Sequence, residues 1–378
     1  MSLKRTPLFA AHEQAGAKLV DFGGWEMPVQ YSGIVAEHKT VRTAAGIFDI
    51  SHMGEVGVSG SAAKAFLNRL LTNDVEKLFP GQGQYTIMCN ESGGAVDDLY
   101  AYRTGPLDYL LIVNASRIDQ DVAWIGSQLE AFEDKANVEV RNLSDKMAAV
   151  AIQGPNSAPL LDQLFPGPSI SETRVDRPSD LEKNELGKFL FGTDEVWVSR
   201  TGYTGEDGFE VVASNDTIVP FWQKSLALGV PVGLEPIGLG ARDTLRTEMC
   251  YPLYGHELDE QTSPIEAGIG FFVALGKNEF NGRGAMAAQK ENGPTKRLVA
   301  FKMTGKSAPP RPNYPIYVGD EKIGETTSGT LSPSLNTGIG LGFVAPEHAK
   351  PDTAIEIEIR NRKFPAVIVR KPIYKKPA

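Results

Sequence analysis

Cysteine, histidine and metal-ligand clusters are scarce in this chain of 378 residues. The only thiols belong to Cys89 and Cys250, which lie far apart and have no C-x-x-C partner. Two such cysteines cannot form a thiolate metal cage, and they favour a reducing compartment. The five histidines are scattered and lack the spacing of metal ligands. We therefore expect no resident metal.

Excess positive charge and long apolar runs are lacking as well. The formal net charge of −9 argues against a nucleic-acid surface, because phosphate neutralisation needs clustered Lys and Arg. The longest apolar stretches, near 109–113 and 147–152, are too short to cross a bilayer, and no apolar segment of a secretory signal follows the first residues. The sequence predicts a cytoplasmic protein with neither a membrane nor a nucleic-acid partner.

What is present is an ordinary globular composition, with 41% hydrophobic and 22% charged residues, in a chain long enough for two or three domains. Apolar stripes at helical spacing predict helices over 63–71 and 122–132, with Ser61 and Ser116 as candidate N-caps. Period-2 runs predict strands at 83–90, 96–102, 109–114, 148–153, 188–191, 196–201 and 208–212. Further helices are predicted at 157–164, 218–228 and 237–249. After residue 290, short strands separated by Gly and Pro predict an all-β domain of barrel or sandwich type over 291–378.

The most informative segment is a glycine pair, Gly93-Gly94, followed by two acids at the start of a predicted strand. Strand alternation places Asp98 on one face with Val96, Tyr100 and Tyr102, and Asp97 on the other with Leu99 and Ala101. A carboxylate among aromatic rings is poorly solvated, which suits proton or cation chemistry. From these residues alone, Asp98 is either a functional acid or part of a solvated acidic turn, and Asp97 is expected to be structural or solvated.

A second informative segment is the glycine-rich loop 202–208 and the strand after it. We expect Glu206 and Asp207 to be solvated in an exposed turn. Glu210 differs because it lies within a strand, where an ionised acid needs a partner. Arg242 is a candidate partner, either in a structural pair or together with Glu210 at the edge of a ligand ring.

Taken in order, the motifs resemble those of aminomethyltransferase, the T-protein of the glycine cleavage system, from residue 5 to about residue 374. The segments that carry the likeness are Arg5-Thr6-Pro7-Leu8, His12, Gly16-Ala17-Lys18, Phe22 to Pro28, Tyr31, Phe48 to Gly54, Gln84-Tyr85-Thr86, Gly93 to Leu99, Gln153-Gly154-Pro155, Gly202 to Glu210, Ala241-Arg242-Asp243, Tyr254 to Leu258 and Thr327-Ser328-Gly329.

The resemblance implies an α+β, three-domain, cloverleaf-like fold with a C-terminal β-barrel domain. Residues 1–290 would form the folate-binding aminomethyltransferase region, and 291–378 the barrel. Within the first region, about 1–50 plus 141–256 would form one domain, and about 51–140 plus 257–290 the other.

It also implies a reaction without metal or redox cofactor. An aminomethyl group on the lipoyl arm of a partner, the H-protein, would react with tetrahydrofolate to give 5,10-methylenetetrahydrofolate, ammonia and the reduced arm. Asp98 resembles the family's key catalytic carboxylate. Glu210 resembles the acid that binds the pterin edge, and Arg242 the folate-contacting arginine. The other residues that match the folate pocket are Tyr203, Tyr85, Met53, Tyr100, Asn114 and Tyr374.

Three alternatives accompany this interpretation. A tetrahydrofolate-dependent demethylase on the same fold is the first, although such relatives tend to lose the full run from Gly202 to Gly208. The second is a folate-binding relative in iron–sulfur assembly, which needs a cysteine motif that neither Cys89 nor Cys250 provides. The third is a binding module without catalysis, against which the presence of Asp98 together with Glu210 and Arg242 argues.

Overall fold

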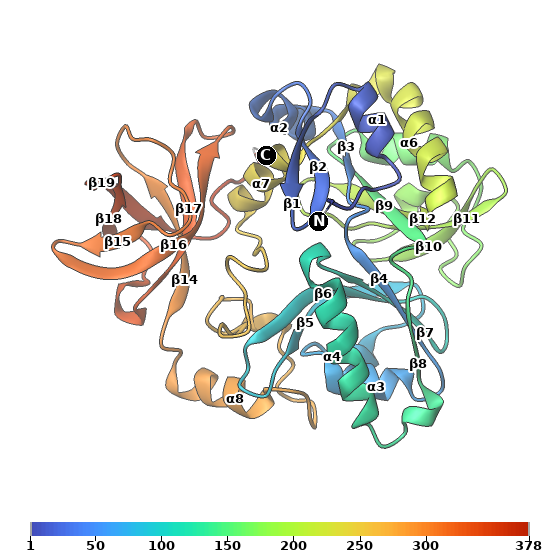
Figure 1. Ribbon diagram of the computed structural model, residues 1–378, viewed down its shortest axis with the longest axis horizontal. Helices are drawn as coiled ribbons and strands as arrows, with labels where there is room; N and C mark the ends of the chain where they lie inside the picture. Colours follow the sequence, from blue (N-terminus) through green and yellow to red (C-terminus); the bar gives the residue numbers. More distant parts are fainter. Residues whose placement is uncertain (1, 377–378) are drawn as a thin grey trace. The chain divides into compact units, whose positions relative to one another are not determined.

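The computed structural model describes residues 2–376, and Figure 1 follows them along the chain by colour. The chain forms two compact units. The first unit runs to Thr86 and includes Asp98–Arg242, and the second comprises Ile87–Asp97 and the chain from Asp243 onward. Three elements cross from one unit into the other: β5 (Gln82–Cys89), β6 (Ala95–Arg103) and α7 (Leu239–Met249).

The first unit contains a six-stranded sheet with the order β10-β11-β12-β9-β3-β13. Its strands are β3 (Ala45–Asp49), β9 (Met147–Gln153), β10 (Leu186–Phe191), β11 (Asp194–Ser199), β12 (Gly208–Ser214) and β13 (Leu234–Pro236). All neighbours are antiparallel except β13 and β3, which are parallel. Helices α5 (Ser157–Leu164) and α6 (Asn215–Gly229) pack on this sheet through a fully apolar core that includes Leu161, Phe209 and Phe221. The sheet is the rigid support of β12, which carries Glu210.

An N-terminal layer completes this part of the first unit. It consists of α1 (Phe9–Gln14), the hairpin β1 (Lys18–Phe22) and β2 (Trp25–Gln30), and α2 (Ile34–Thr43). Gly238 and Gly240, at the start of α7, approach β2 closely, because a Cβ on Gly238 would lie 2.4 Å from the carbonyl oxygen of Val29. These glycines permit the close packing that places the first turns of α7, and thus Arg242, beside the N-terminal layer.

A five-stranded antiparallel sheet has the order β5-β6-β7-β4-β8. The remaining elements of this region are β4 (Gly54–Ser59), β7 (Asp108–Val113), β8 (Glu139–Asn142), α3 (Ala63–Leu70) and α4 (Ile118–Glu130). The predicted helices are confirmed, but the predicted caps are wrong. Helix α3 begins after Ala62 and α4 after Arg117, and neither cap residue forms a side-chain capping bond. Ser116 lies inside a 3₁₀ turn, Ala115–Arg117, so it cannot occupy the flanking position of α4.

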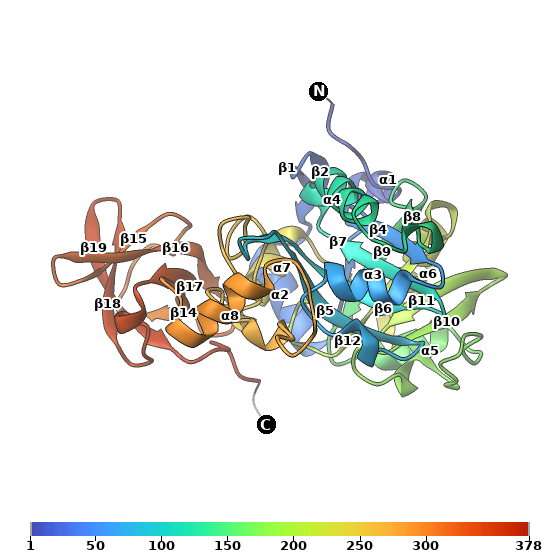
Figure 2. The ribbon, with the colours of Figure 1, turned by 90° about the horizontal axis from the view of Figure 1, so that it is seen from below.

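The second unit contains a closed barrel with the strand order β14-β17-β16-β15-β18-β19, seen from two directions in Figures 1 and 2. The barrel strands are β14 (Arg297–Met303), β15 (Pro315–Val318), β16 (Glu321–Ser332), β17 (Thr337–Val344), β18 (Ala354–Ile359) and β19 (Arg362–Val369), and helix α8 (Arg283–Asn292) precedes them in the chain. An apolar interior that includes Phe301, Ile316, Ile357 and Ile368 fills the barrel.

The mixed α and β architecture and the C-terminal barrel confirm the predicted fold class. No helix within residues 2–376 combines the length and the apolar character that a membrane span requires.

Candidate active site

The nine predicted site residues all have intermediate solvent exposure, being neither buried in a core nor fully open to solvent. Eight of them belong to the first unit. The ninth, Tyr374, belongs to the second unit, where its backbone N–H donates to the carbonyl of Glu248 at 3.1 Å.

The carboxylate of Asp98 is held from both sides by neighbouring strands. The hydroxyl of Tyr85 donates to Oδ2 at 2.8 Å, and Nδ2 of Asn114 donates to Oδ1 at 3.0 Å. Tyr85 comes from β5, and Asn114 directly follows β7. The register that pairs Tyr100 with Ile112, continued by two residues, sets Asp98 opposite Asn114. Two fixed donors therefore orient this acid with its charge in a defined place.

Met53 reaches the same region through the adjoining strand. It closes a turn in which its backbone N–H donates to Ile50 at 3.0 Å, and it precedes Gly54, which pairs with Val113. Continuing that register places Met53 next to Asn114. The backbone of Met53 thus lies beside that of Asn114, which donates to Asp98.

Three tyrosines connect Asp98 to the six-stranded sheet. The rings of Tyr85 and Tyr100 have their centroids 6.1 Å apart, and those of Tyr100 and Tyr102 stack at 5.5 Å. The hydroxyl of Tyr100 donates to Oδ1 of Asn184 at 3.0 Å, and that of Tyr102 donates to Ser199 at 3.2 Å. Burial raises the pKa of Tyr102 well above its ordinary value, so its hydroxyl stays neutral. The result is a rigid aromatic wall.

Glu210 stands at the other end of this wall. Thr201 Oγ1, which is 3.0 Å from the hydroxyl of Tyr102, donates to Oε2 of Glu210 at 2.7 Å. Burial raises the pKa of Glu210, whereas the hydrogen bond from Thr201 and the charge of Arg242 act in the opposite direction. A carboxylate so desolvated is stabilised further by any ligand that brings N–H donors to its free edge.

Arg242 lies on α7 with its guanidinium carbon 4.8 Å from the ring centroid of Tyr203. Burial lowers the pKa of Arg242, and the neighbouring Tyr203 and Glu210 favour its charged form. Within residues 2–376, its guanidinium has the face of Tyr203 as its partner and no protein acceptor at hydrogen-bond distance. A guanidinium held over an aromatic ring can still direct its N–H donors to a planar ligand.

His52 is buried next to these residues, and its ring packs edge-on against Phe22 with the centroids 5.6 Å apart. Burial, aided by the charge of Arg242, lowers the pKa of His52 to about 4. The imidazole is therefore neutral at physiological pH and adds no second positive charge beside Arg242.

One acid, Glu206, lies in an environment that the sequence did not predict. The side chain of Glu206 is buried, not solvated, because Arg42 of α2 pairs with it at 3.0 Å and also donates to the carbonyl of Thr204 at 2.7 Å. Asp207 is exposed as expected, in a bidentate pair with Arg200. Asp97 is fully buried, which leaves the structural role and excludes the solvated one.

Sequence reasoning missed Thr201, Ser199 and Gln153. Ser199 is the cross-strand partner of Glu210, and Thr201 follows it two residues later on the same face of the strand. This period-2 alternation could have identified both residues. Gln153 belongs to the segment Gln153-Gly154-Pro155 that carries the family resemblance, but its role has no local signal, since its two hydrogen-bond partners lie about 50 residues away.

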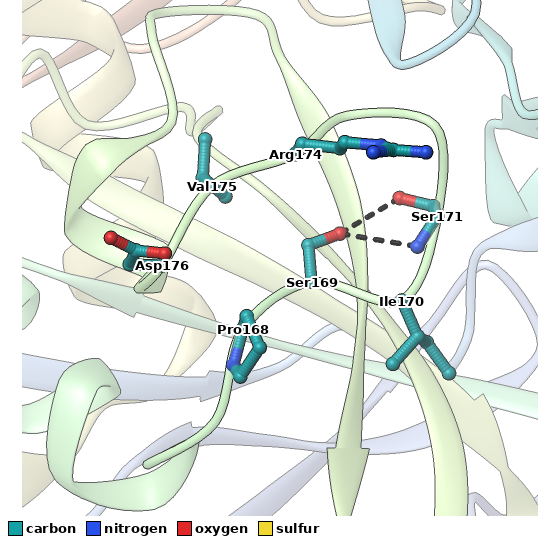
Figure 3. A pocket seen from close by; sticks show the side chains of 7 residues that line it. All are labelled: Pro168, Ser169, Ile170, Ser171, Arg174, Val175 and Asp176. Carbon is teal, nitrogen blue, oxygen red and sulfur yellow. Dashed lines mark hydrogen bonds between the residues drawn. The ribbon is translucent and has the colours of Figure 1, made fainter.

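Nothing in the described part of the chain gathers three metal-ligating side chains. A separate surface hollow, shown in Figure 3, is formed by the segment between α5 and β10 and lined by Pro168, Ser169, Ile170, Ser171, Arg174, Val175 and Asp176. It contains none of the nine predicted site residues.

Comparison with known proteins gives one consistent family. The family model "GCVT N-terminal domain" matches residues 8–277, and "Glycine cleavage T-protein C-terminal barrel domain" matches residues 296–375. Aminomethyltransferases of Bacillus cereus and Bacillus mycoides are each 47% identical over 381 residues, covering 100% of this chain and 99% of the relative. The crystal structure of glycine cleavage system aminomethyltransferase T from Bartonella henselae superposes with a TM-score of 0.89 at 31% identity, covering 99% of both chains.

Proposed function

Since this chain belongs to the aminomethyltransferase family of glycine cleavage T-proteins, it is a transferase, and we propose that it acts on tetrahydrofolate and the lipoylated H-protein. The methylene carbon of an aminomethyl group passes from the lipoyl sulfur to the folate. The two folate nitrogens that bind this carbon each lose one hydrogen. The bonds from the methylene carbon to nitrogen and to sulfur break, and one of these hydrogens goes to the amine, which leaves as ammonia, while the other goes to the sulfur, which becomes a thiol.

The observation that carries the proposal is the fixed carboxylate of Asp98, with Tyr85 and Asn114 each donating to one of its oxygens. As ammonia departs, the methylene carbon bound to folate becomes cationic and iminium-like. A carboxylate that is already oriented stabilises this charge without reorganising, which is how preorganised groups lower a barrier. Asp98 also orients the folate nitrogens for attack.

Glu210, Arg242 and Tyr203 form the pterin end of the proposed site. The pterin edge presents adjacent N–H groups that match one carboxylate in a bidentate manner. Glu210 is suited to this role because its desolvated carboxylate is bound by Thr201 on one oxygen. Arg242, stacked over Tyr203, adds donors for the acceptor atoms of the folate.

The remaining assignments complete the proposal. Tyr85, Tyr100, Asn114 and Met53 line the pocket beside Asp98, and Tyr374 contributes a contact from the C-terminal segment. We further propose that residues 1–290 divide into two domains, about 1–50 plus 141–256 and about 51–140 plus 257–290, before the domain 291–378. The protein acts in the cytoplasm and needs no metal.

A coupled assay with purified aminomethylated H-protein and tetrahydrofolate tests the proposal. We expect formation of methylenetetrahydrofolate and ammonia in equal amounts, and none when either substrate is omitted. A demethylase would instead consume an N-methylated amine and leave aminomethylated H-protein unchanged, and that result would overturn the proposal.

A further inference from the structure

Gln153, the last residue of β9, is a buried polar side chain whose amide joins two points of a neighbouring loop. Its Nε2 donates to the carbonyl of Thr201 at 3.0 Å, and its Oε1 accepts from the hydroxyl of Thr204 at 2.9 Å. Only 1% of the residue is exposed. Both ends of the amide are therefore used in holding the segment that connects β11 to β12.

The glycines of this loop are fitted to the same amide. A Cβ on Gly202 would lie 1.9 Å from Oε1 of Gln153, and its three nearest atoms would all belong to Gln153. A Cβ on Gly208 would lie 2.5 Å from Nε2. The loop thus wraps around one side chain, and glycine is required where the backbone approaches the amide most closely.

Gln153 holds both ends of the segment 201–204, and two residues of this segment contact the proposed folate-binding side chains Glu210 and Arg242. Thr201 donates to Glu210 at 2.7 Å, and Tyr203 supplies the ring on which Arg242 stacks. Gln153 itself bonds to neither Glu210 nor Arg242 in the described structure. Its influence on them passes through Thr201 and through the loop that carries Tyr203.

We propose that Gln153 is a positioning residue for tetrahydrofolate, setting the loop 201–204 so that Glu210 and Arg242 present their polar edges to the pterin. This inference rests on the proposed function. Because Gln153 lies beneath the pterin end of the site, its loss affects folate affinity and leaves the recognition of the lipoylated partner intact. A purely structural role would instead lower stability without a selective effect on one substrate.

Calorimetry with tetrahydrofolate tests this on Gln153→Met, which keeps the side-chain volume and removes both hydrogen bonds. We expect the Kd for tetrahydrofolate to rise about tenfold, as loss of a fixing hydrogen bond does, while the KM for aminomethylated H-protein at saturating folate stays within about twofold. The matched control is Asn156→Ala, which removes an amide that donates to the carbonyl of Val232 at 3.0 Å, away from the loop. An unchanged Kd in folded Gln153→Met would overturn the inference.

A second variant keeps the test decisive if Gln153→Met folds poorly. Gly202→Ala keeps the Gln153 side chain, but the added methyl group collides with its amide and displaces it. This variant should therefore weaken folate binding to a similar extent. In the Gln153→Ala background the obstructing atoms are gone, and we expect the added Gly202→Ala to change the Kd by less than about twofold. If the losses of folate affinity in Gly202→Ala and Gln153→Ala add fully in the double variant, Gly202 does not act through its contact with the Gln153 amide.

Folate binding by the unaltered protein and by Gln153→Met distinguishes a wrong function from a wrong role for Gln153. If the unaltered protein binds no tetrahydrofolate, the proposed function is wrong. If it binds tetrahydrofolate and Gln153→Met binds it equally well, only the role of Gln153 is wrong. The same measurement tests whether Gln153 acts through Glu210. If it does, Gln153→Met has less left to disturb once Glu210 is replaced, so in a Glu210→Gln background it should raise the Kd by less than about threefold.

Discussion

The hydroxyl of Tyr85 donates to Oδ2 of Asp98 at 2.8 Å, joining the edge of the aromatic wall to the acid that we place at the reacting carbon. The bond matters because Asp98 stabilises developing charge only if its oxygens are already in place. With Asn114 on the other oxygen, Tyr85 restricts rotation of the carboxylate.

Replacing Tyr85 with Phe removes this donor and keeps the ring. A hydrogen bond to a charged group contributes about 1.5 kcal/mol or more, so we expect kcat in the coupled assay to fall roughly tenfold. Tyr109→Phe is the control, since the buried hydroxyl of Tyr109 has no hydrogen-bond partner among the described residues. Equal activity of the two variants would show that the Tyr85 hydroxyl does not support catalysis.

Glu210→Gln tests the pterin end of the site. The amide still accepts from Thr201, but the negative charge beside Arg242 and the bidentate match to N–H donors are lost. We expect the Kd for tetrahydrofolate, measured by calorimetry, to rise by about ten- to a hundredfold, with little change in Tm. Glu195→Gln, an exposed glutamate on the adjacent β11 that pairs with Lys188, should leave the Kd unchanged. A normal Kd in Glu210→Gln would assign Glu210 a structural role.

Glu55 gives a prediction about stability and pH. It is fully buried on β4, and neither carboxyl oxygen has a hydrogen-bond partner among the described residues. Burial raises the pKa of Glu55 from 4.5 to about 8. Between these values the folded protein holds a proton that the unfolded chain has lost. Raising the pH through this window therefore favours unfolding, by up to about 1.4 kcal/mol per pH unit.

Glu55→Gln is neutral at every pH, so its Tm should exceed that of the unaltered protein increasingly from pH 5 to pH 8. The control is Glu139→Gln on the neighbouring β8, an exposed residue whose pKa is lowered by Arg141 and which titrates below this window. If Glu55→Gln and the unaltered protein show parallel Tm curves over pH 5–8, Glu55 is ionised in the folded state.

Local sequence patterns predicted the elements and one face of the site. Period-2 alternation separates Asp98 from Asp97 because a strand has no other way to direct successive side chains. The structure agrees, with Asp98 and Tyr100 partly exposed and Leu99 and Ala101 buried on β6. The barrel could be anticipated for a similar reason, since Gly and Pro mark the ends of short strands.

Tertiary contacts account for the rest. A solvated Glu206 was the expectation because nothing near it in sequence suggested a partner, yet Arg42, which pairs with it, lies 164 residues earlier. The bond from Tyr102 to Ser199 and the clamp of Gln153 on Thr204 likewise join residues 97 and 51 positions apart. Periodicity describes which way a side chain points, but it cannot specify what a distant segment brings to it.

Turnover by Asp98→Asn with aminomethylated H-protein and tetrahydrofolate tests the catalytic role of Asp98 most directly. The amide keeps the shape of the side chain and removes the charge, which should cost about 3 kcal/mol and lower kcat roughly a hundredfold or more. The control is Asp108→Asn, an exposed acid on β7 of the same sheet. We expect this loss of turnover while the Kd for tetrahydrofolate stays within about threefold of normal. Undiminished ammonia release by Asp98→Asn would contradict that role.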